Sequence, residues 1–150
     1  MQDSANISIR ETPVETIRSL RHRVLRAGLP LEAAIFDGDD EPTSRHVAAF
    51  NQSAEVIGCV SIVQRPWNGE PAWQLRGMAV TDGLRGSGVG KLLLTNVEQI
   101  VRSQRHSATL WCNARTPAVG FYEAAGWRRV GEQFNIPTAG PHFQMYKTLC

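Results

Sequence analysis

One segment constrains the fold of this chain more than any other: a strand-like run leads through a glycine-rich turn into a helix. Residues 73–80 have the apolar content of a buried strand, and apolar residues recur at helical spacing over residues 89–105. Between them lies the run RGSGVGK, residues 85–91. Glycines let backbone N–H groups approach an anion closely, and a helix N-terminus adds unpaired donors and a positive dipole end. The segment therefore predicts a phosphate or pyrophosphate site.

The glycine spacing argues against two common nucleotide-binding loops. A dinucleotide fingerprint G-x-G-x-x-G needs its third glycine where this chain has Lys91 or Leu93. A P-loop needs glycine where the chain has Arg85, and Ser or Thr where it has Leu92. A nucleotide-binding enzyme of another class is therefore disfavoured, and an ordinary tight turn stays open as the alternative to an anion site.

Strands and helices alternate irregularly along the rest of the chain. A first helix is expected to open at Pro13 and to stop at Gly28 and Pro30, and a third to have Thr116 as its N-cap, with Pro117 as its first residue. This order indicates one α/β or α+β domain over residues 1–150. The expected strands are residues 6–10, 45–51, 55–64, 73–80, 108–112, 127–134 and 142–149.

Composition excludes several classes of protein. A formal net charge of +2 is too small for a nucleic-acid-binding surface and favours small-molecule partners. No basic segment precedes an apolar core at the start, and no stretch approaches 18 apolar residues, so neither export nor a membrane span is expected. Cys59, Cys112 and Cys150 form no even disulfide framework, which favours a reducing cytoplasm.

Other charged and reactive residues have simpler interpretations. Cys112 is interpreted as a buried strand residue, because no nearby histidine would activate it as a nucleophile. The histidines show no paired ligand spacing and no C-x-x-C occurs, so no metal is expected. The basic residues of the first helix are predicted to form its solvated face, with an acidic-ligand role as the alternative. They are Arg18, Arg21, His22, Arg23 and Arg26.

Two motifs carry a resemblance to a known family. The pattern Arg/Gln-x-x-Gly-x-Gly/Ala is filled by Arg85, Gly88 and Gly90, directly after the strand ending Met78-Ala79-Val80. Asn113, expected at a strand end, is followed by the run AVGFYEAAGW, residues 118–127. The chain thereby resembles the GNAT superfamily of N-acetyltransferases over nearly its whole length. The resemblance implies a mixed, mostly antiparallel central sheet of about seven strands flanked by about four helices.

The resemblance also implies a cosubstrate, acetyl-coenzyme A, and the residues that hold it. In the family the loop amides bind the pyrophosphate, and backbone groups of the strand pair with the pantetheine arm. The tyrosine at the position of Tyr122 often protonates the departing thiolate. From the residues alone, Tyr122 could instead pack beside Phe121, and Asn113 could be a strand-end cap. The implied coenzyme-binding residues are Met78, Val80, Arg85, Gly86, Ser87, Gly88, Val89, Gly90, Lys91, Asn113 and Tyr122.

The implied reaction is direct transfer of an acetyl group to a primary amine of a small molecule or peptide. Glu132 and His142 are the candidates for a general base, although the family often uses water instead. The resemblance places the acceptor near residues 18–36, Trp67 and residues 134–143. A non-catalytic acyl-coenzyme A sensor, a larger acyl group and a homodimer formed through an open sheet edge stay open as alternatives.

Overall fold

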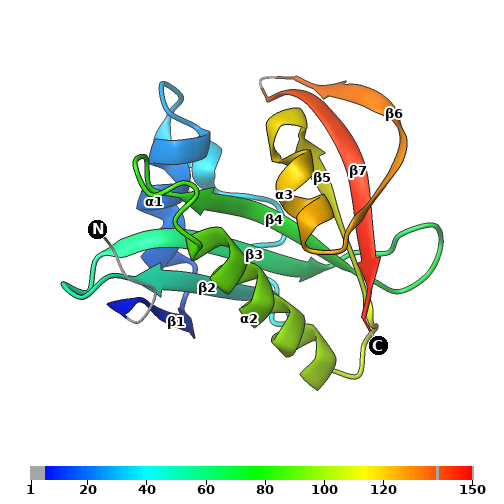
Figure 1. Cartoon of the computed structure of the whole chain (residues 1–150), viewed down its shortest axis with the longest axis horizontal. Coiled ribbons are helices and arrows are strands. Elements are labelled where there is room, and N and C mark those ends of the chain that lie inside the picture. The colour runs from blue at the N-terminus through cyan, green and yellow to red at the C-terminus, as the bar shows by residue number, and fades with distance from the viewer. Residues whose placement is uncertain (1–5, 138, 150) are drawn as a thin grey trace. The chain divides into compact units, whose positions relative to one another are not determined.

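A computed structural model describes residues 6–137 and 139–149 of the chain (Figure 1). Its strands lie in one seven-stranded sheet in the order β1-β2-β3-β4-β5-β7-β6. The registered pairs are antiparallel except for β4 with β5, which is parallel, so the expected mixed, mostly antiparallel sheet is confirmed. In chain order the elements are β1 (Ser8–Glu11), α1 (Glu15–Leu25), a 3₁₀ helix (Leu31–Ala34), β2 (Arg45–Phe50), β3 (Val56–Gln64), β4 (Trp73–Val80), α2 (Val89–Ser103), β5 (Thr109–Arg115), a second 3₁₀ helix (Thr116–Ala118), α3 (Val119–Ala124), β6 (Arg128–Ile136) and β7 (Gly140–Thr148).

Two local predictions differ from the structure. The described residues contain three α-helices, against about four expected, and Leu31–Ala34 forms a short 3₁₀ helix. Thr116 is not the N-cap of α3: it begins a 3₁₀ helix, and α3 starts at Val119. Strand β5 continues to Arg115 because it pairs with β7 as far as the Arg115↔His142 position, so the helix begins later than local sequence suggests.

The chain forms two compact units. The first comprises the chain up to Val63 together with Leu75–Ile100, and the second comprises Gln64–Gln74 together with the chain from Val101 on. No helix in the described ranges is long and apolar enough to cross a bilayer.

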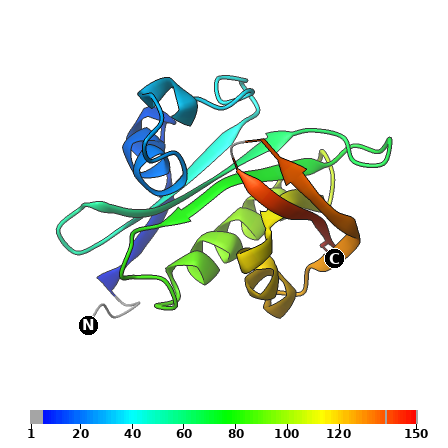
Figure 2. The ribbon, with the colours of Figure 1, turned by 90° about the horizontal axis from the view of Figure 1, so that it is seen from above.

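Helices α1 and α2 lie on opposite faces of the sheet in the first unit (Figure 2). Ile17 and Leu20 of α1 are fully or almost fully buried and belong to one core cluster with Cys59 of β3. The preceding residue, Gly58, faces the other way: a Cβ there would lie 2.8 Å from Val89 Cγ1 at the start of α2. Because successive strand residues point to opposite faces, β3 anchors both helices and sets where α2 begins.

The second unit contains the antiparallel strands β5, β7 and β6, with α3 on one face (Figure 1). Side chains along β5 alternate regularly between buried and half-buried positions. The start of β4 adds a short parallel pairing, in which Trp73 and Gln74 lie opposite Leu110 and Trp111.

Candidate functional site

The glycine loop of the first unit has an open backbone. Gly86 and Gly88 have φ angles of +83° and +95°, a region that side-chain-bearing residues rarely adopt, and a Cβ at either position would meet nothing within 4 Å. The Ser87 amide donates to Leu84 O over 3.1 Å, and the Ser87 hydroxyl donates to the same oxygen. The loop is thus a formed turn whose outer backbone is accessible to a ligand. It runs into α2 at Val89, where the first helical N–H groups lack intrahelical partners.

Two exposed cations flank this turn. Arg85 Nη2 lies 3.0 Å from Asp82 Oδ1, but the two side chains are 64% and 85% exposed, so the ion pair contributes little to stability. Lys91 is exposed in the first turn of α2. Val89 differs from both, because its side chain is fully buried and only its backbone can contribute to an anion site. Gly90, the second residue of α2, is half-buried.

Strand β4 carries the other two predicted coenzyme residues of the first unit. Met78 and Val80 are half-buried on either side of the buried Ala79. The strand is kinked just before them, at Gly77, whose φ is +63°. The parallel pairing of β4 with β5 uses Trp73 and Gln74, so it does not use the backbone groups of residues 78–80. Backbone groups of a strand can pair with an extended ligand as a further strand would.

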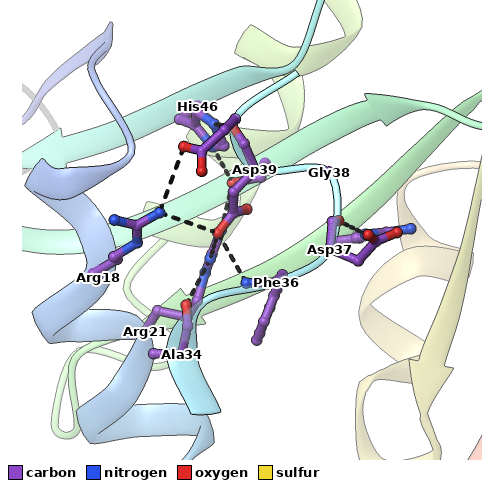
Figure 3. A network of polar contacts seen from close by, with 12 residues as sticks. Arg18, Arg21, Ala34, Phe36, Asp37, Gly38, Asp39 and His46 are labelled. Carbon is purple, nitrogen blue, oxygen red and sulfur yellow. Dashed lines mark hydrogen bonds and ion pairs between the residues drawn. The ribbon is translucent and has the colours of Figure 1, made fainter. Parts of the chain in front are cut away.

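A buried polar network around Arg21 and Asp39 (Figure 3) lies beside Gly77. Contrary to the prediction of a solvated helix face, Arg21 is fully buried. Its Nη1 donates to Asp39 Oδ2 over 2.7 Å and to Ala34 O over 2.9 Å, and its Nη2 donates to Ser61 Oγ over 2.9 Å. The buried carboxylate, 18 residues further along the chain, supplies the countercharge that makes this burial tolerable.

The same network fills the space beside Gly77. A Cβ at Gly77 would lie 3.2 Å from Arg21 Nε and 3.2 Å from Phe36 Cε2, and the Arg21 guanidinium stacks over the Phe36 ring at 4.1 Å. His46 completes the network, because its Nε2 donates to Asp39 O and its Nδ1 accepts from the Ser61 hydroxyl. The kink next to Met78 is therefore held by groups from α1, β2 and β3.

In the second unit, Tyr122 is buried on α3. Its ring lies 5.1 Å from the rings of Phe121 and Trp127, and the Trp127 amide donates to Tyr122 O. Burial, and secondarily the neighbouring Cys112, raises the pKa of the Tyr122 phenol well above its ordinary value of 10.0. The phenol is therefore protonated at neutral pH and available as a proton donor.

Cys112 itself is a free, buried thiol, as the sequence predicted. Burial raises its pKa from 9.0 to about 12, so it is protonated and a poor nucleophile at neutral pH. Cys59 is likewise free and buried, and burial raises its pKa to about 12 although the nearby Arg21 acts in the opposite direction. Neither thiol offers a covalent catalyst.

Asn113 lies within β5 and not at its end, since the strand runs on to Arg115. Its Oδ1 is buried and has no hydrogen-bond partner in the described part of the chain. A buried acceptor left unpaired costs free energy, which an amide N–H donated by a ligand would recover. Asn113 therefore fits a role in holding an amide-containing group such as pantetheine better than a capping role.

The two candidate bases differ in their surroundings. His142 is the third residue of β7, is buried, and its Nδ1 lies 2.7 Å from Gly140 O. Glu132 is exposed, in the irregular stretch of β6 between Val130 and Phe134. Only His142 is therefore held in a defined orientation by a contact that the structure shows.

An aromatic cluster on the second unit was only partly predicted. Trp67 stacks on Tyr146 with ring centroids 4.7 Å apart, and its Nε1 donates to Gln144 Oε1 over 3.1 Å. Trp111 lies opposite Tyr146 in the sheet and donates from Nε1 to Arg65 O. Sequence analysis proposed Trp67 alone, although alternation along β5 and β7 could have identified its partners.

The predicted site residues are thus divided between the two units. The first holds Met78, Val80 and the loop of residues 85–91, and the second holds Asn113, Tyr122 and both candidate bases. No cluster of metal-ligating side chains occurs among residues 6–137 and 139–149. A cavity of about 360 Å³ at the end of α2, lined by residues 101, 102, 104–108 and 149, contains none of the predicted residues.

Comparison with known proteins gives consistent results. The model of the acetyltransferase (GNAT) family matches residues 13–127. The "Uncharacterized N-acetyltransferase YitI" of Bacillus subtilis (strain 168) is 34% identical over 145 residues, which cover 95% of this chain and 97% of that protein. The match therefore extends over nearly the full length of both proteins.

Solved structures share the fold at lower identity. A GCN5-related N-acetyltransferase from Kribbella flavida has a TM-score of 0.76 and 20% identity, covering 98% of this chain and 100% of its own. An aminoglycoside 6'-N-acetyltransferase complexed with coenzyme A has a TM-score of 0.74 and 18% identity, covering 94% and 96%. These likenesses establish the architecture that the sequence predicted.

Proposed function

Because the chain belongs to the acetyltransferase (GNAT) family, we propose that it transfers the acetyl group of acetyl-coenzyme A to a primary amine of a small molecule or peptide. The observation that carries this proposal is the open glycine loop at the start of α2. Gly86 and Gly88 present backbone where a pyrophosphate would need close approach, and a Cβ at either position would meet nothing within 4 Å.

The residues of this chain fit the coenzyme at three places. The loop of residues 85–91 would hold the pyrophosphate through its amides, with Arg85 and Lys91 adding positive charge. Backbone groups of Met78 and Val80 would pair with the pantetheine arm, and the unpaired Oδ1 of Asn113 would accept one of its amide N–H groups. Coenzyme A is bound in the aminoglycoside acetyltransferase of the same fold, which supports this assignment.

Tyr122 would act as the general acid. The bound thioester supplies an acyl carbon activated toward amines. The phenol then donates its proton to the departing sulfur. Because the pKa of Tyr122 is raised, the phenol stays protonated at neutral pH until the C–S bond breaks. Residues 1–150 would act as one domain, which a family match spanning both units supports. We further propose a cytoplasmic location, supported by the free thiols of Cys59 and Cys112.

The first test is calorimetric titration of the protein with acetyl-coenzyme A. Tight binding is expected for the wild type and loss of binding for Gly88→Glu, whose carboxylate would repel the pyrophosphate. Gly28→Glu is the matched control, since Gly28 has a similar φ of +84° and equally open surroundings but lies outside the loop. A folded wild type that binds no acetyl-coenzyme A would overturn the proposal.

Turnover separates an enzyme from a coenzyme sensor. The wild type is incubated with acetyl-coenzyme A and a panel of primary amines containing monoamines, polyamines, aminoglycosides and lysine peptides, and release of the free thiol is followed. Amine-dependent thiol release supports a transferase. Binding without release from any member of the panel would favour the sensor that the sequence left open.

A further inference from the structure

The two faces of the β5–β7 sheet carry different chemistry. Cys112 points to the face covered by α3, where it neighbours Tyr122. Asn113, the next residue along β5, points to the other face. The Tyr122 phenol of α3 therefore lies against one face of β5, and the unpaired amide oxygen of Asn113 lies on the other.

Strand register places His142 on the face of Asn113. Asn113 lies opposite Gln144 of β7, and Arg115 lies opposite His142. Directly opposite residues of an antiparallel pair share a face, so all four side chains belong to one face, with His142 diagonal to Asn113. The Phe134 ring, opposite His142 on β6 and 6.0 Å away, lies on the same face as His142.

One hydrogen bond sets the tautomer of His142. Its Nδ1 lies 2.7 Å from the carbonyl oxygen of Gly140, and a carbonyl can only accept, so Nδ1 carries the proton. In the neutral ring the lone pair is then on Nε2, which has no hydrogen-bond partner in the ranges that the structure describes. The backbone of β7 thus holds an imidazole in the form that can accept a proton.

We propose that His142 is the general base that removes a proton from the acceptor ammonium, on the sheet face opposite Tyr122. This inference rests on the proposed acetyl transfer. It assigns the two reacting groups to opposite faces of the sheet: the amine arrives on the face of His142, and the thiolate leaves toward the face of Tyr122.

The ammonium gives one proton to His142 Nε2, and the freed lone pair forms the C–N bond at the acyl carbon. The C–S bond breaks as the sulfur takes the Tyr122 phenolic proton. The nitrogen loses a second proton, which restores the phenol, and His142 releases its proton to water. The products are the N-acetylated amine, coenzyme A as the free thiol, and one proton.

The neighbouring strands carry four charged residues, of which Arg128 and Arg129 lie opposite Tyr146 and Met145, further along β7 from His142. Arg115 is directly opposite on β5, and Glu132 is in the irregular stretch of β6. A pH profile could report either the imidazole or the carboxylate. Glu132→Gln is therefore measured alongside the histidine variant. On the acidic side of the pH profile, kcat/KM of Glu132→Gln is expected to fall as it does in the wild type.

The kinetic test uses His142→Asn, whose side-chain amide can still donate to Gly140 O but has no basic nitrogen. With an alkyl primary amine from the panel, kcat/KM at pH 7 is expected to fall by about a hundredfold, a typical loss for a general base. The difference in kcat/KM between the variant and the wild type should shrink as the pH approaches the pKa of the amine. Hydroxylamine is largely uncharged at pH 7, so kcat/KM with this substrate should fall little in the variant. The KM for acetyl-coenzyme A should not change.

His106→Asn is the matched control, because His106 is exposed, its ring centroid lies 5.6 Å from that of Trp73, and it is not among the residues assigned to the site. A His142→Asn variant that acetylates the alkylamine at the wild-type rate and with the wild-type pH profile would overturn the inference alone. An equal loss for hydroxylamine and the alkylamine would also overturn it, since that indicates a structural role. A wild type that acetylates no amine would instead overturn the proposed function.

Nitrogen-15 NMR of the histidine ring tests the assignment without any acceptor. Long-range couplings in the wild-type protein at neutral pH should show His142 with its proton on Nδ1. A ring protonated only on Nε2 would have no lone pair at the proposed position and would overturn the inference.

Discussion

Arg21 Nη1 and Asp39 Oδ2 form an ion pair over 2.7 Å in which the two side chains are 0% and 3% exposed. The carboxylate also accepts from the Phe36 amide, and the arginine reaches Ser61 on β3. The pair therefore fastens the segment after the first 3₁₀ helix to α1 and the sheet. Breaking a buried pair is costly because the remaining charge stays buried without compensation.

Asp39→Asn is expected to lower the free energy of unfolding by about 3 kcal/mol. The amide keeps the shape of the carboxylate but leaves Arg21 without its countercharge. Urea denaturation measures the change. Asp40→Asn is the control, because that side chain is 82% exposed and its ion pair with Arg18 is long, at 3.8 Å. The free energy of unfolding should therefore fall by less than about 1 kcal/mol. Equal effects of the two variants would contradict the burial of the pair.

Gly58→Ala is expected to destabilise the protein by about 1–3 kcal/mol, a typical cost of overpacking. Its Cβ would lie 2.8 Å from Val89 Cγ1 and 2.9 Å from Leu93 Cδ1, so α2 would have to move away from β3. Thermal and urea unfolding check the prediction. Gly120→Ala in α3, where a Cβ meets nothing within 4 Å, should be neutral or slightly stabilising. An unchanged free energy of unfolding in Gly58→Ala would show that α2 packs less closely on β3 than these distances indicate.

Tyr122→Phe is expected to reduce kcat about a hundredfold and to leave acetyl-coenzyme A affinity nearly unchanged, because only the proton donor is removed. The buried ring would keep its contacts with Phe121 and Trp127, so stability should change little. Steady-state kinetics and calorimetry provide the two measurements. Wild-type turnover in the variant would remove Tyr122 from the mechanism.

Stability is expected to fall at alkaline pH through the buried thiols. The pKa of Cys112 is raised from 9.0 to about 12, and that of Cys59 likewise. Raised values mean that the native state holds these protons more tightly, so the stabilisation is complete below about pH 9 and is lost as the pH rises toward 12.

Within that window each thiol should lower the free energy of unfolding by about 1.4 kcal/mol per pH unit. Urea denaturation at several pH values gives the slope, which Cys112→Ala should reduce by the share of one thiol. An unchanged slope in both Cys112→Ala and Cys59→Ala would show that these thiols ionise in the native state as they do in the unfolded chain.

The sequence by itself determined the features that depend on neighbouring residues. The bounds of β4, Trp73–Val80, and the start of α2 at Val89 follow from local periodicity and are found as predicted. The glycine pattern of residues 85–91 pointed to the family that the comparisons show. These signals are local, because strand alternation, helical spacing and a glycine turn each arise within about ten residues.

The tertiary structure decided which polar groups are buried and what they contact. Arg21 resembles a surface residue of an amphipathic helix, yet its partners Asp39 and Ser61 lie 18 and 40 residues away. Asn113 lies within a strand because β7 continues the pairing, and the same pairing puts His142 on its face. Local spacing cannot specify such contacts, since they depend on which distant strands pair and in which register.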